Sequence, residues 1–98
     1  MERFWSWSGK YIGVRQGSYL VSCSGEVIGK FWGNEIYSSE GDYLCEIMRE
    51  NRLIRNLTKN SQHRTLFSRY IRGTINQRYR DYAPYPMTIG YEDFVYDE

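Results

Sequence analysis

The sequence predicts a mainly β fold of short hairpin repeats, followed by one short α-helix and an extended C-terminal tail. Three observations predict this order of elements. A pattern of serine and glycine returns every sixteen residues in the first half of the chain. Tyrosine, tryptophan and glycine are plentiful, a composition that favours strands and turns. Beyond residue 60 the apolar spacing becomes helical, and both prolines lie after that stretch.

The repeat occupies residues 4–60 and predicts one hairpin per unit. Its three clear copies are FWSWSG, LVSCSG and IYSSEG, which start at residues 4, 20 and 36. In each copy a serine holds the third place and a glycine the sixth, and a charged residue and an apolar pair follow. A unit therefore reads strand, glycine turn, strand, polar turn, which is β-hairpin spacing. A fourth, degraded copy without the glycine is expected in RLIRNLTKN, at residues 52–60.

An isolated hairpin cannot bury its own apolar face, so the units are expected to share one core. The residues expected in it come from the strands of the units: Ile12, Leu20, Ile28, Ile36, Leu44 and Leu53. The two cysteines, Cys23 and Cys45, are either paired or free, and we expect small buried hydrophobic residues because their spacing is not that of a metal site.

These units resemble a known family. The pattern S-x-x-G-x-x-I-G at a sixteen-residue period is similar to that of the four-fold β-flower proteins, small bacterial domains in which hairpins surround a pseudo-fourfold axis. The tail YPMTIGYEDF, residues 85–94, is similar to the C-terminal ends of longer members. Cys45 departs from the pattern, which has glycine there. The resemblance implies a pseudo-fourfold arrangement of hairpins over residues 1–60, and it implies no activity and no functional residues.

The second half predicts a helix and a connection over residues 61–83. Leu66, Phe67, Tyr70 and Ile71 follow the i, i+1, i+4, i+5 spacing of one helical stripe. Asn60 or Ser61 would cap its start and Gly73 its end. His63 falls within the stripe, so we expect a half-buried histidine rather than a catalytic base.

The charge is unevenly distributed, which raises a second functional hypothesis. Residues 47–80 contain nine lysines and arginines and one acidic residue, whereas residues 81–98 contain five acidic residues and no basic one. A basic segment with interleaved tyrosines is typical of nucleic-acid or other polyanion binding. The candidate residues are Arg64, Arg69, Arg72, Arg78 and Arg80. The competing interpretation is a solvated helix face whose arginines pair with the acidic flanks.

The tail, residues 84–98, is aromatic and acidic. Pro84 and Pro86 impose an extended course. Two interpretations stay open: the tail packs on the β domain as a lid, or it docks on a partner or a second copy of the chain. The candidate partner-binding residues are Tyr85, Tyr91 and Phe94.

The sequence carries no signal of catalysis. We find no phosphate-binding glycine loop, no metal-ligand spacing and no nucleophile–base motif, so we expect no catalytic residue, metal or cofactor. The primary hypothesis is a non-catalytic protein–protein or self-association module. Polyanion binding is the alternative, and a hydrolase or nuclease is a third and weaker one. Since no apolar run has the length of a signal peptide or a membrane span, we expect a cytoplasmic protein without a membrane partner.

Overall fold

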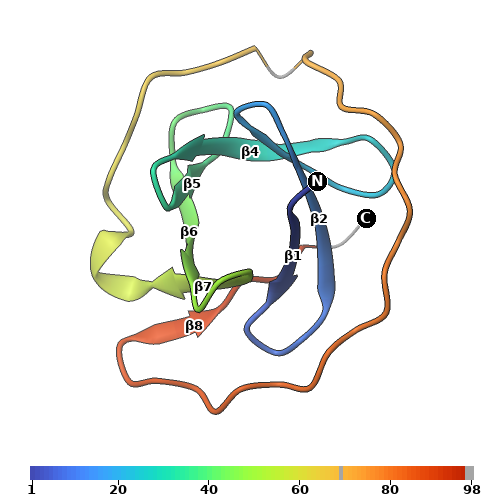
Figure 1. The fold of residues 1–98 in the computed structure, drawn as a ribbon. Helices are drawn as coiled ribbons and strands as arrows, with labels where there is room; N and C mark the ends of the chain where they lie inside the picture. The colour runs from blue at the N-terminus through green and yellow to red at the C-terminus, as the bar shows by residue number, and fades with distance from the viewer. Residues whose placement is uncertain (69, 97–98) are drawn as a thin grey trace.

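Seven strands close into a barrel in the computed structural model, which describes residues 1–68 and 70–96 (Figure 1). Each strand pairs antiparallel with the next, and a parallel pairing between β1 and β7 closes the ring. A further strand, β8, adds to β7. The strands are β1 (Arg3–Ser6), β2 (Tyr11–Gln16), β3 (Tyr19–Val21), β4 (Val27–Trp32), β5 (Glu35–Tyr37), β6 (Tyr43–Met48), β7 (Arg52–Asn56) and β8 (Tyr91–Asp93). A single 3₁₀ turn, η1 (Leu57–Lys59), follows β7. The prediction of a mainly β fold is confirmed.

The sixteen-residue period is visible in the backbone as one β-bulge per unit. The strand pairing shifts register directly after Phe4, Leu20 and Ile36. A bulge bends its strand and increases the local twist. Three bulges at equivalent places therefore let strands of three to six residues curve into a closed ring.

The barrel interior holds the core. Its buried cluster consists of Phe4, Ile12, Leu20, Ile28, Phe31, Ile36, Cys45, Leu53 and Phe94. Five of the six residues expected from the repeat lie in this cluster, and the sixth, Leu44, packs against it while partly exposed. Neither cysteine forms a disulfide, and burial raises the pKa of the Cys45 thiol well above its ordinary value.

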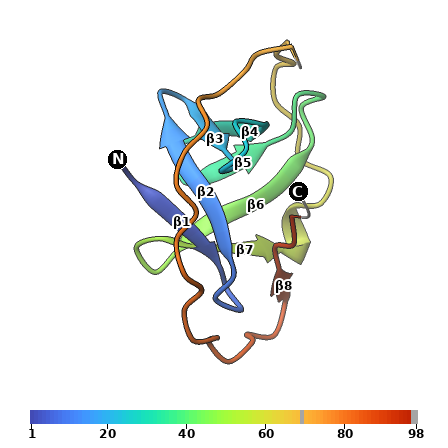
Figure 2. The same cartoon turned by 90° about the vertical axis from the view of Figure 1, so that its right-hand side faces the viewer.

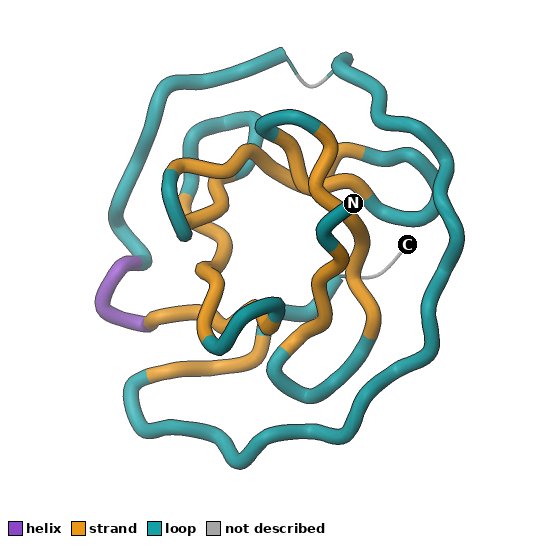
Figure 3. Tube along the Cα trace, in the orientation of Figure 1, coloured by secondary structure: helices purple, strands orange, loops and turns teal. Residues whose placement is uncertain are grey.

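The helix predicted over residues 61–83 is wrong. Residues 60–68 and 70–90, which we name the belt, run around the outside of the barrel (Figure 3), and none of the described residues between 61 and 83 is helical. Leu66 and Tyr70, expected on a buried stripe, are exposed, and His63 is exposed as well. The physical reason is that the barrel supplies hydrogen-bond acceptors for the belt's amide groups, so the belt needs no helical bonds of its own.

The chain returns to the barrel after the belt. The stretch that leads into β8 extends beyond the barrel strands before turning back (Figure 2). β8 pairs with β7, and Phe94 then enters the core at 8% exposure. The hydroxyl of Tyr96 donates a hydrogen bond to Glu26, on a turn of the second unit. These contacts tie residues 91–96 to the barrel.

A polar cluster fixes the start of the belt. The ammonium group of Lys59 contacts Glu35 at 2.7 Å and Glu46 at 2.9 Å. The hydroxyls of Tyr37 and Tyr43 donate to the same two carboxylates, at 2.9 Å and 2.8 Å. The hydrogen bond with Lys59 lowers the pKa of Glu35 from its ordinary value of 4.5, and these carboxylates raise the pKa of Lys59 to about 12.

The cluster predicts a specific loss of stability in acid. The pKa of Glu35 is lower in the folded state than in the unfolded state. Its contribution to the free energy of unfolding is therefore complete above pH 4.5, and it is lost as the pH falls through the folded-state pKa. Glu35→Gln should therefore lower the free energy of unfolding at pH 7, and its difference from wild type should shrink below pH 4.5. Urea denaturation at several pH values measures both. Glu40→Gln, at an exposed turn, is the control. An unchanged difference between pH 7 and pH 3 would contradict the prediction.

Candidate protein-binding surface

The belt docks on the glycine turns of the three units in reverse order. The carbonyls of Gly41, Gly25 and Gly9 accept hydrogen bonds from the amides of Arg64, Gly73 and Tyr82, at 2.9, 2.9 and 2.7 Å. Two residues before each glycine, Ser39, Cys23 and Trp7 accept from Phe67, Asn76 and Tyr85, at 3.1, 3.0 and 3.1 Å. The acceptors are sixteen residues apart and the donors nine. The belt is thus a nine-residue repeat that follows the sixteen-residue repeat of the barrel.

A signal for this second period is present in the sequence and was missed. RTLFSRY, from residue 64, and GTINQRY, from residue 73, share four matched places: threonine, an aliphatic residue, arginine and tyrosine. Leu66, Phe67 and Tyr70 of RTLFSRY also have the spacing of a helical stripe, and the helix prediction rested on RTLFSRY and Ile71 without GTINQRY. A search for equal spacing between RTLFSRY and GTINQRY would have found the period.

Charge distinguishes the three docking places. A charged residue follows each docking glycine. The residue before each belt donor is basic where that charge is negative, and acidic where it is positive. The resulting pairs are Lys10 with Asp81, Glu26 with Arg72, and Asp42 with His63. Asp42 and His63 are in contact at 3.0 Å, and Glu26 and Arg72 line the same hollow of about 250 Å³. Asp81 accepts a hydrogen bond from the amide of Tyr11, next to Lys10. A belt shifted by one unit in one direction would place Arg72 beside Lys10, and a shift in the other direction would place Asp81 beside Glu26, so these pairs favour the observed register.

The first unit binds the belt with two tryptophans, Trp5 and Trp7, which the other two units lack. Trp5 stacks on Tyr82, with ring centroids 4.1 Å apart and an interplanar angle of 17°. Trp7 packs on Tyr85 at 5.0 Å. Both indole N–H groups donate to belt carbonyls at 2.9 Å, from Trp5 to Arg80 and from Trp7 to Pro86. The belt is therefore bound here by side chains as well as by the backbone.

Arg52 lies beneath the same stretch of belt. It is 4% exposed, and its guanidinium donates to the carbonyls of Trp7 at 3.2 Å and Ala83 at 2.9 Å. The guanidinium also lies over the ring of Tyr85, 4.1 Å from its centroid. Together with the two indoles it makes residues 80–86 a firmly supported segment.

Exposed apolar side chains follow directly on this support. Met87 is 50% exposed and Ile89 fully exposed, in the loop of residues 86–90, which we name the projecting loop. Leu57, 40% exposed, lies beside it, since its amide donates to the carbonyl of Gly90 at 3.0 Å. An exposed apolar group on a rigid support is typical of a protein-binding surface.

The described arginines proposed for polyanion binding do not form one cluster. Arg64 lies 3.8 Å from Glu35 on β5, and Arg72 lies beside the Gly25 turn. Arg78 lies 3.6 Å from Asp81, and the backbone of Arg80 binds Trp5 on β1. Arg69 lies outside the described residues. The four described arginines thus lie at three separate places along the belt, with Arg78 and Arg80 together beside the first unit.

The residues proposed for partner binding have separate roles in the fold. Tyr85 packs on Trp7 and Arg52 and stays partly exposed, next to the projecting loop. Tyr91 begins β8 and pairs with Asn56. Phe94 is buried in the core and is not accessible to a partner in this structure. Tyr85 and Tyr91 therefore flank the projecting loop at its two ends, and the amide of Tyr91 donates to the carbonyl of Thr88 within the loop at 3.2 Å.

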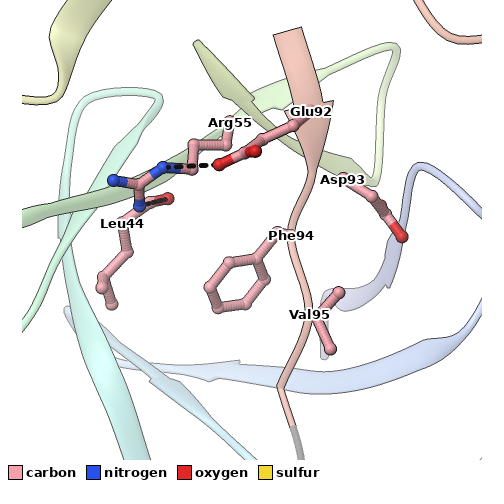
Figure 4. Close-up of a pocket in the computed structure, with 6 residues that line it drawn as sticks. All are labelled: Leu44, Arg55, Glu92, Asp93, Phe94 and Val95. Carbon is pink, nitrogen blue, oxygen red and sulfur yellow. Dashed lines mark hydrogen bonds and ion pairs between the residues drawn. The ribbon is translucent and has the colours of Figure 1, made fainter. Parts of the chain in front are cut away.

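A second hollow, of about 460 Å³, lies at the C-terminal end of β8 (Figure 4). It is lined by Leu44, Arg55, Glu92, Asp93, Phe94 and Val95. Arg55 donates to Glu92 at 3.1 Å and to the carbonyl of Leu44 at 3.2 Å, so its hydrogen bonds lie within the lining. Across residues 1–68 and 70–96, no group of three or more histidine, cysteine or acidic residues is placed to hold a metal ion.

Comparisons with known proteins add no family. No family model, curated protein or solved structure matches the chain. Over the described part of the chain, no helix has the length and apolar character that crossing a membrane requires.

Proposed function

We propose that this chain is a non-catalytic protein-binding module, which binds a partner protein or a second copy of itself through the projecting loop. The observation that carries the proposal is the exposure of Met87 and Ile89 on a segment that the barrel holds in place. Partner residues that cover these side chains remove apolar surface from water without ordering a flexible loop. Tyr82 and Tyr85, both partly exposed, extend the surface with the residue type most common in binding hot spots.

The described arginines give less support to the alternative, polyanion binding. Arg64 lies close to the carboxylate of Glu35, and Arg78 lies close to that of Asp81. A polyanion would have to compete with these carboxylates for the two arginines. A nucleic acid also needs several cations along one path to release counterions cooperatively. The protein-binding proposal needs only the one loop.

The proposal extends to architecture and location. Three units with the same bulge, each bound by the belt at the same turn, support a pseudo-fourfold organisation like that of the four-fold β-flower proteins. β7 and β8 would form the fourth unit from distant parts of the chain. Two cysteines without a disulfide are in keeping with a reducing compartment, so the cytoplasm is the proposed location.

Photo-crosslinking tests the binding surface. A photoreactive amino acid at position 89, expressed in the native cell, should give one dominant adduct, either with another protein or with a second copy of the chain. The same amino acid at position 75 is the matched control, because Ile75 is also exposed and also lies on the belt. Ultracentrifugation of the purified chain over a range of concentrations then separates self-association from binding to another protein. The same adducts from both positions, or none from position 89, would contradict the proposal.

A further inference from the structure

The first unit is more elaborate than belt docking requires. Sixteen and thirty-two residues after Trp5 the chain has Val21 and Tyr37, and the equivalents of Trp7 are Cys23 and Ser39. The belt docks at all three turns through the same pair of backbone hydrogen bonds. The two indoles and Arg52 are therefore additions, present at one turn only, and they call for a separate explanation.

These additions consist of hydrogen-bond donors and flat surfaces. The indole groups of Trp5 and Trp7 and the guanidinium of Arg52 each donate to a carbonyl of the belt, on Arg80, Pro86 and Ala83. Trp5 also offers its ring face to Tyr82. At the second unit the side-chain bonds run both ways: the belt's Asn76 donates to the carbonyl of Ser22, and Gln16 of the barrel donates to the carbonyl of Thr74.

The segment bound at the first unit suits this chemistry. Both prolines of the protein, Pro84 and Pro86, lie in it. Proline has no amide hydrogen, so a proline-containing segment offers mainly carbonyl acceptors, and it is extended before it binds. Grooves lined by aromatic side chains recognise extended proline-containing peptides on this principle.

We propose that Trp5, Trp7 and Arg52 form a recognition groove for extended peptides of the pattern aromatic–x–Pro–aromatic–Pro, and that residues 82–86 of the chain occupy this groove as an internal ligand. A partner that carries the same pattern exchanges with the internal segment. This site lies on the inner side of the belt and does not depend on the projecting loop.

The internal segment competes with any added peptide. A tethered ligand acts at an effective concentration of the order of millimolar, so wild type binds an added peptide weakly. Weakening the internal segment removes this competition and leaves the groove residues intact. Tyr82→Ala/Tyr85→Ala does so by deleting the two rings that pack on Trp5 and Trp7.

The test is an NMR titration of the full chain with a synthetic peptide of residues 79–88, followed through the indole N–H signals. The double variant should bind the peptide at least tenfold more tightly than wild type, with shifts for Trp5 and Trp7. The signal of Trp32, on β4, is the internal control. Adding Trp7→Phe to the double variant, or replacing both prolines of the peptide with alanine, should weaken binding about tenfold.

Two results would overturn the proposal: a folded variant whose Trp5 and Trp7 signals do not move at millimolar peptide, or equal binding of a scrambled peptide. If the double variant does not fold, Tyr85→Ala carries the same test, because it keeps the stacked pair of Trp5 and Tyr82. Crosslinking from position 89 is a separate readout, so the groove and the projecting loop can fail independently.

Discussion

Replacing Gly9 with alanine is expected to lower the free energy of unfolding by about 3 kcal/mol or more. Gly9 has a φ of +94°, and a Cβ there would lie 2.0 Å from the carbonyl oxygen of Tyr82. The left-handed backbone alone costs roughly 1–2 kcal/mol for a residue with a side chain. The rest of the loss comes from displacing the belt, which breaks the hydrogen bond between Tyr82 and Gly9. Urea denaturation with an unchanged slope measures the effect.

Alanine variants of Gly25 and Gly17 separate the cost of a left-handed backbone from the cost of crowding against the belt. Gly25 has a similar φ of +88°, but its Cβ would lie 3.0 Å from the nearest belt atom, so Gly25→Ala should cost about 2 kcal/mol. Gly17 has a φ of +61°, and no atom lies within 4 Å of the place its Cβ would take, so Gly17→Ala should cost about 1 kcal/mol. If Gly9→Ala and Gly17→Ala lower the free energy of unfolding equally, the belt does not pack closely on the Gly9 turn.

Phe94→Ala is expected to lower the free energy of unfolding by about 3–4 kcal/mol, although Phe94 lies only four residues before the last residue of the sequence, Glu98. The ring belongs to the core cluster, so its removal leaves a cavity at the end of the barrel. Val95→Ala is the control: Val95 is exposed, and a loss below about 0.5 kcal/mol is expected. Thermal and urea unfolding of both variants measure the difference. A loss below about 1 kcal/mol for Phe94→Ala would mean that the tail contributes little to stability.

The hairpin units could be predicted because their signal is local. Serine and glycine at fixed places specify a turn, and the apolar positions between them specify the inward face of each strand, as at Ile12 and Ile28. Closure of the barrel could not be predicted in this way. It depends on a parallel pairing of β1 with β7, between residues nearly fifty positions apart, and no short pattern encodes that pairing.

The belt was mispredicted because its partner lies elsewhere in the chain. Leu66 and Tyr70 have helical spacing, yet the amides around them bond to turns of the barrel. A local pattern does not show that such acceptors are available. The same limit applies to the candidate site: Tyr85 was identified from its aromatic, proline-flanked context, whereas Trp5, Trp7 and Arg52 acquire their role only when the belt lies across them.

The two periods limit how the protein can change in length. An extra residue in the belt between two docking amides would put every later amide out of phase with its turn, and an extra residue within a barrel strand would shift the register that places the docking glycines Gly9, Gly25 and Gly41. A Cβ at Gly17 or Gly33 would have no atom within 4 Å, so extra residues at the tips of these two turns have room and leave the barrel strands and the docking glycines in place. Length variation in this architecture is therefore confined to one rim of the barrel.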